Sequence, residues 1–132
     1  MLKNSFIVIF ILFYFNIVQS WELNKTDYCE FTYSKTKGNG ACGTWLDTDK
    51  QDYAAISYRE WKKGNLKDDP LCKNICITVD NNIGKRVTVP IRDICWYCHS
   101  QNHVVLSKKA FVKLAPLSRE HYYFATKTYK KC

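Results

Sequence analysis

Hydrophobic and polar residues alternate along much of the chain with the two-residue period of a β-strand. The clearest case is the run 85–92, in which Val87, Val89 and Ile91 share one face. Pro90 lies on the opposite face and indicates an edge position or a gap in the hydrogen-bond ladder, because proline has no N–H to donate. Further β-prone segments are 30–33, 52–57, 75–79, 103–106 and 121–130. Six short strands predict a closed or nearly closed β-barrel.

Helical signals are few. Ser107 can cap a short helix in which Ala110, Phe111 and Leu114 form an apolar face before Pro116 ends it. A second helical turn is expected around 58–62, and the segment 80–84 supplies a turn between two predicted strands. The predicted fold class is mainly β, a six-stranded barrel with one or two short helices.

The first twenty residues have the pattern of a secretory signal peptide. Lys3 is followed by a nearly unbroken apolar run from Ser5 to Val18, and Ser20 is a suitable last residue before cleavage. The alternative is a membrane anchor, but the run is shorter than the roughly 20 residues that a spanning helix needs. We therefore expect a secreted, extracellular protein without a membrane span.

The remaining chain divides into a tail, 21–28, and one domain, 29–132. In the tail, Asn24 begins the sequence Asn-Lys-Thr, which is an N-glycosylation acceptor in a eukaryotic secretory pathway. The alternative is an unmodified polar segment.

Composition narrows the class of protein. The 132 residues are 46% hydrophobic and 15% aromatic, which excludes a disordered chain, and the length excludes a large multidomain enzyme. The net charge of +8 has two interpretations. It can simply keep the surface soluble, or it can attract the protein to acidic polymers or anionic membranes. No nucleic-acid recognition module is present in the sequence, so nucleic acid is not an expected partner.

Seven cysteines follow the predicted cleavage site, which is typical of a disulfide-bonded secreted domain. The odd number predicts three bridges and one unpaired thiol; the protein is expected to be a monomer, with a dimer through that thiol left open. The spacing Cys72-x3-Cys76 and Cys95-x2-Cys98, with His99 adjacent, approaches that of a zinc ribbon. Secretion favours disulfides instead, so we expect no metal and no cofactor.

Several short motifs occur in a characteristic order along the chain. They are Gly40-Ala41-Cys42-Gly43, Asp47-Thr48-Asp49, Tyr53-Ala54-Ala55-Ile56-Ser57, Cys72-x3-Cys76, Arg92-Asp93-Ile94-Cys95-x2-Cys98, Val105-Leu106-Ser107 and Ala110-Phe111-x2-Leu114. This order resembles the double-psi β-barrel of the barwin, expansin and rare-lipoprotein-A-like superfamily, and within it the short secreted members common in fungi. The likeness covers residues 29–130. By similarity to expansins, it implies the bridges Cys42–Cys72 and Cys76–Cys132, and leaves Cys95 and Cys98 to bond each other or Cys29.

Asp93 is the carboxylate that the resemblance singles out, because the matching Asp is important for activity in expansins and related lytic enzymes. The favoured alternative is a structural Asp that accepts N–H groups of a loop. Glycoside hydrolysis normally needs two carboxylates. The second one of the expansin pattern is Val105 here, in the segment His103-Val104-Val105-Leu106-Ser107, and the transglycosylase His is absent after Ala55. We therefore expect that the protein is not an enzyme.

Aromatic residues in or beside loops offer a binding surface instead. Trp96 and Tyr97 lie between Cys95 and Cys98, next to Asp93, where flat rings could stack on a sugar or a polysaccharide. The alternative is that such rings fill the core. The predicted ligand-binding set is Asp93, Trp96, Tyr97, Trp45 and His103.

The sequence thus predicts a secreted, non-catalytic barrel that binds an extracellular or cell-wall polysaccharide. A protein-binding role, as an effector of host interaction or a protease inhibitor, is the first alternative, with a secreted or host protein as partner. A weak glycan-cleaving enzyme that uses Asp93 is the second.

Overall fold

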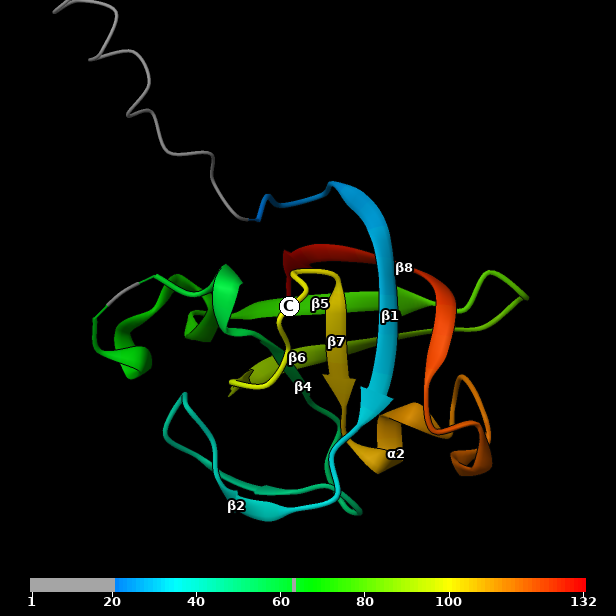
Figure 1. The fold of residues 1–132 in the computed structure, drawn as a ribbon. Coiled ribbons are helices and arrows are strands. Elements are labelled where there is room, and N and C mark those ends of the chain that lie inside the picture. Colours follow the sequence, from blue (N-terminus) through cyan, green and yellow to red (C-terminus); the bar gives the residue numbers. More distant parts are fainter. Residues whose placement is uncertain (1–20, 63) are drawn as a thin grey trace, which may run out of the picture.

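A computed structural model describes residues 21–62 and 64–132; the predicted signal peptide lies outside the described residues. Six strands close into a barrel in the order β1-β7-β4-β6-β5-β8 (Figure 1). Their bounds are β1 Thr26–Tyr33, β4 Ala54–Ser57, β5 Ile75–Asp80, β6 Arg86–Cys95, β7 His103–Leu106 and β8 Tyr122–Lys131. This confirms the mainly β fold class and the six-stranded barrel.

Two of the strand pairs in the barrel are parallel, β1 with β7 and β4 with β6, while the others are antiparallel. This mixture is that of a double-psi barrel, in which chain segments cross in a crowded interior. The crossing needs small side chains, and all four residues of β4, two of them Ala54 and Ala55, are buried. Pro90 pairs with Cys76 of β5 just before the β4 pairing starts at Ile91, so its missing N–H falls where the ladder changes partner.

The short helix α2 (Lys108–Phe111) packs against β1 and β7. As predicted, the Ser107 hydroxyl caps it by accepting the N–H of Ala110 at 3.2 Å. The ring of Phe111 meets Phe31 edge-on, with 5.3 Å between the ring centres. The described residues also form four 3₁₀ turns: η1 Tyr58–Glu60, η2 Leu66–Asp68, η3 Pro70–Cys72 and η4 Leu117–Arg119. The first of them lies in the predicted turn 58–62.

Two parts of the β structure differ from the prediction. Strand β1 starts at Thr26 and not at Glu30 as predicted, because β8 is long enough to pair with it back to Thr128. A separate hairpin, β2 (Lys37–Asn39) with β3 (Trp45–Asp47), was not predicted. The turn between β2 and β3 begins at Gly40. An added Cβ at this position would lie 2.5 Å from the carbonyl oxygen of Arg92, so only glycine fits this close approach.

The disulfides are Cys42–Cys72, Cys76–Cys132 and Cys95–Cys98. The first two are those implied by the expansin likeness, and the third settles the alternative that was left open. The seventh cysteine, Cys29, is unpaired and has 0% exposure in the barrel core. A dimer through this thiol would therefore require the barrel to open, and a zinc ribbon is excluded because its four cysteines are oxidised.

Among residues 21–62 and 64–132, no three or more His, Cys, Asp or Glu side chains are grouped so as to hold a metal ion. The helices of the same described residues are all too short or too polar to cross a membrane.

Candidate functional site

A disulfide-closed loop forms the centre of the candidate site. Strands β4 and β6 run parallel and end together, with Ser57 opposite Cys95. The residues that follow each strand therefore emerge at the same edge of the barrel. The Ser57 hydroxyl donates to the Cys98 carbonyl at 2.6 Å, which joins the end of β4 to the end of the loop 95–98. The Cys95–Cys98 bridge then closes this loop on itself.

The two middle residues of the loop, Trp96 and Tyr97, are each 64% exposed. This decides between the two roles considered for them: the rings lie on the surface and do not fill the core. Trp61, by contrast, is buried. Trp96 and Tyr97 line different hollows, so the loop forms a ridge between two concave surfaces.

The Trp96 hollow has a volume of about 470 Å³. Its lining residues are Tyr58, Arg59, Trp61, Lys62, Gly64, Leu66, Ile94 and Trp96. The rings of Trp96 and Tyr58 stack with 6.3 Å between centres and 23° between planes. The guanidinium carbon of Arg59 lies 5.7 Å from the centre of the Tyr58 ring, within the range of a cation–π contact.

The Tyr97 hollow, on the other side of the ridge, has a volume of about 450 Å³. Its lining residues are Thr32, Tyr33, Ser34, Lys35, Thr36, Tyr97, His103, Glu120 and His121. The His103 ring lies 6.3 Å from the Tyr97 ring and 5.5 Å from the His121 ring, centre to centre. His103 Nε2 lies 2.8 Å from the Thr32 hydroxyl oxygen. Burial lowers the pKa of His103, against the opposing effect of the nearby Glu30 carboxylate.

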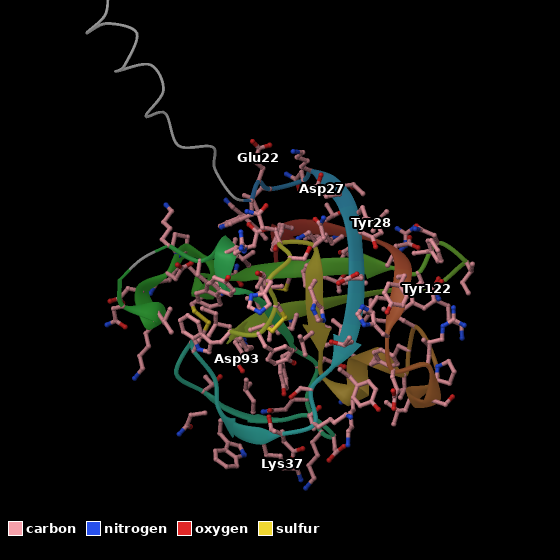
Figure 2. All side chains as sticks on the ribbon, viewed as in Figure 1. Glu22, Asp27, Tyr28, Lys37, Asp93 and Tyr122 are labelled. Atoms are coloured by element: carbon pink, nitrogen blue, oxygen red, sulfur yellow. A yellow bond between two sulfur atoms is a disulfide. The ribbon has the colours of Figure 1, made fainter. Side chains whose placement is uncertain are left out.

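Asp93 is half-buried near the end of β6, on the side that faces the β2–β3 hairpin (Figure 2). Its Oδ1 accepts the backbone N–H groups of Ala41 and Ile94, both at 2.9 Å. The carboxylate therefore holds the turn between β2 and β3 against the barrel. Burial raises the pKa of Tyr97, and the Asp93 charge adds to this rise.

The predicted ligand-binding residues do not all come together. The Tyr97 ring lies beside His103, and the Asp93 charge adds to the rise that burial causes in the Tyr97 pKa; Trp96 is adjacent but lines the other hollow. Trp45 lies apart on β3, 61% exposed, and lines a third hollow with Asp52 and Arg92. Asn24 precedes β1 and is exposed.

Sequence reasoning missed several residues of the two hollows. Tyr58 and Arg59 line one hollow, and Tyr33 and His121 line the other. A signal was available for the first two, because they directly follow the apolar strand that ends at Ser57. Only the parallel pairing of β4 with β6 brings them beside Trp96.

No known family model matches the chain. A papain inhibitor of Streptomyces mobaraensis is 44% identical over 90 residues, which are 68% of this chain and 62% of the relative's own length. The chain thus spans less than two thirds of that relative. The solved structure of Streptomyces papain inhibitor superposes with a TM-score of 0.78 and 38% identity, over 83% of this chain and 97% of the inhibitor chain.

Structures of Clavibacter michiganensis expansin, one of them with cellohexaose, share 22% identity and a TM-score of 0.57 over 82% of this chain and 50% of theirs. At that identity, the likeness to expansin shows the fold alone. The chain thus shares the six-stranded barrel fold of expansin. More narrowly, it belongs to the same family as Streptomyces papain inhibitor.

These comparisons correct the predicted function. Polysaccharide binding was expected from the expansin likeness, but the relatives at 38–44% identity are named papain inhibitors, so that prediction is wrong. The same names confirm the prediction that the chain is not an enzyme. The short fungal type is not supported either, since these inhibitors come from Streptomyces. The three disulfides and the likeness to these inhibitors are consistent with secretion.

Proposed function

We propose that this protein is a secreted inhibitor of papain-like cysteine proteases. The observation that carries the proposal is the likeness to Streptomyces papain inhibitor, which extends over 97% of that chain at 38% identity. An inhibitor of this kind acts by binding. It therefore needs a rigid, exposed surface rather than a paired acid and base.

The loop 95–98 is the part of the molecule that we propose enters the protease cleft. Trp96 and Tyr97 are its exposed rings, and a disulfide together with the Ser57–Cys98 hydrogen bond fixes the loop before any partner arrives. Preorganisation of this kind reduces the entropy lost on binding. Large aromatic residues also dominate the energetics of protein interfaces. His103, beside Tyr97, and Asp93, which holds the neighbouring turn, support the same edge.

Inhibition through a disulfide bond to the protease thiol is not part of the proposal. The unpaired Cys29 has 0% exposure, and burial raises its pKa to about 12, so it is neither accessible nor ionised at neutral pH. The proposed inhibition is non-covalent.

Titration of preactivated papain with the purified, oxidised protein tests the function. We expect inhibition that saturates at one inhibitor per protease and that is recovered unchanged after dissociation. Trypsin and subtilisin serve as controls, because they use a serine nucleophile in differently shaped clefts. Absence of inhibition of papain and of related cysteine proteases at micromolar concentration would overturn the proposal.

We also propose that residues 1–20 direct export and are removed. N-terminal sequencing of the protein secreted by a eukaryotic host should begin at Trp21, and its mass should show whether Asn24 carries a glycan. An N-terminus at Met1 in the culture medium would contradict the predicted cleavage.

A further inference from the structure

The Trp96 hollow has an unusual balance of charge. Its lining includes two cationic side chains, Arg59 and Lys62, and no carboxylate. Both side chains are exposed, and neither forms an ion pair with any other described residue. The neighbouring Asp69 is buried, and its two oxygens accept the backbone N–H groups of Lys62 and Leu71. The two cations are therefore free to meet an external anion.

The walls of this hollow are apolar and fixed. The indole N–H of Trp61 donates to the Ile56 carbonyl at 3.2 Å, so its polar atom is satisfied inside the protein and the ring can serve as an apolar wall. Trp96 stacks with Tyr58, and the Tyr58 ring in turn supports the Arg59 guanidinium. The volume of about 470 Å³ falls within the usual range of ligand pockets, roughly 300–1,000 Å³. Trp, Tyr and Arg are also the residues most enriched at binding hot spots.

We propose that the Trp96 hollow receives a carboxylate side chain of the inhibited protease, an Asp or Glu next to an apolar residue. Arg59 binds the carboxylate through its planar guanidinium, and Lys62 adds a second positive charge at the rim. The apolar neighbour packs against Trp96 and Tyr58. This inference rests on the proposed inhibitory function and names the chemistry of the partner surface.

The Tyr97 hollow does not share this preference. Its lining combines the Lys35 ammonium with the Glu120 carboxylate, two histidines and several hydroxyl groups, so its positive charge is opposed by a carboxylate. The ridge thus separates a surface selective for anions from one that is not. We expect electrostatic specificity to come from the Trp96 side alone.

Charge reversal at the hollow tests the proposal. Arg59→Glu and Lys62→Glu should each raise the inhibition constant for papain about tenfold, because a like charge then faces the protease carboxylate. Arg59→Lys should lose less, since it keeps the charge but not the planar donor fork. Lys85→Glu is the matched control: Lys85 is exposed in the β5–β6 turn, and this turn lies at the other end of the barrel from the turn η1 that carries Arg59 (Figure 1). It should change inhibition less than twofold.

Salt dependence separates this role from a general loss of packing. Inhibition by the wild type should weaken as ionic strength rises, and this dependence should flatten in Arg59→Glu. Trp96→Ala should weaken inhibition equally at all salt concentrations, because it removes an apolar wall. Thermal unfolding of each variant checks that the barrel is intact. If the wild type inhibits papain but the two reversal variants stay within twofold of it, the inference fails while the function stands. If the wild type does not inhibit, both fail.

Discussion

Lys127 Nζ lies 3.5 Å from Glu60 Oε1, and both side chains are only 3% exposed. The same ammonium donates to the Gln101 carbonyl oxygen. Burial lowers the pKa of Lys127, and the Glu60 charge opposes that shift. Glu60 ends the 3₁₀ turn that carries Tyr58 and Arg59, while Gln101 follows the loop 95–98. Lys127 of β8 therefore anchors both sides of the Trp96 hollow, one through an ion pair and the other through a hydrogen bond.

Removal of one partner of this ion pair should strongly lower the stability of the fold. Lys127→Met removes the ammonium that pairs with the buried Glu60 carboxylate, and should lower the free energy of unfolding by about 3–5 kcal/mol. The double variant Lys127→Met/Glu60→Leu should lose much less, because no isolated charge remains inside. Urea unfolding of the single variants Lys127→Met and Glu60→Leu and of the double variant measures the difference. Equal losses in single and double variants would contradict this account.

The Cys29 thiol should be unreactive in the native protein. Its burial predicts no reaction with Ellman's reagent near neutral pH until the chain is denatured, when one thiol should appear. Burial also raises its pKa from 9.0 to about 12. Between these two pH values the folded state holds a proton that the unfolded chain releases. The contribution of Cys29 to the free energy of unfolding is therefore complete below pH 9.0 and is lost as the pH rises towards about 12.

The variant Cys29→Ala isolates that effect, because it has no thiol to ionise. Its unfolding free energy should fall less steeply than that of the wild type at alkaline pH. Rapid labelling of the native wild-type thiol would show that the barrel opens more readily than its packing indicates.

Acid should weaken the fold through His103. Burial lowers its pKa below the usual 6.5, so the unfolded chain binds a proton that the folded state resists. The stabilisation is present above pH 6.5 and is lost as the pH falls below it. His103→Gln keeps a polar partner for Thr32 and should flatten this dependence. Melting temperatures of both proteins across mildly acidic pH measure it; parallel curves would rule the effect out.

Asp93 should act through its hydrogen bonds rather than its charge. Asp93→Asn retains an oxygen that can accept the N–H groups of Ala41 and Ile94, so papain inhibition should stay close to that of the wild type. Asp93→Ala loses both bonds and should lower the unfolding free energy by about 1–3 kcal/mol, with weaker inhibition. If Asp93→Asn abolishes inhibition in a fully folded protein, the negative charge itself contacts the protease.

The sequence predicted those parts of the fold that depend on local pattern. The alternation around Val87, Val89 and Ile91 identified β6, and the Ser107 cap identified α2. Strand β1 was predicted too short, since the segment from Thr26 is extended mainly because β8 lies beside it. The hairpin β2–β3 depends in the same way on pairing and on the close approach at Gly40, neither of which has a hydrophobic period.

The site was only partly predictable for a related reason. The exposed pair Trp96 and Tyr97 could be found because two cysteines bracket it. Tyr58 and Arg59 could not be joined to it without knowing that β4 and β6 end together. The function was assigned wrongly because a barrel shared with expansins specifies a frame and not a partner.

The common end point of Ser57 and Cys95 has a practical consequence for engineering. The Cys95–Cys98 disulfide and the Ser57–Cys98 hydrogen bond fix the backbone of the loop 95–98. Neither of them involves the side chains of Trp96 or Tyr97. Residues 96 and 97 can therefore be varied together while the rest of the barrel is kept unchanged. Substitutions at these two positions should therefore change the exposed surface of the loop while its backbone stays in place.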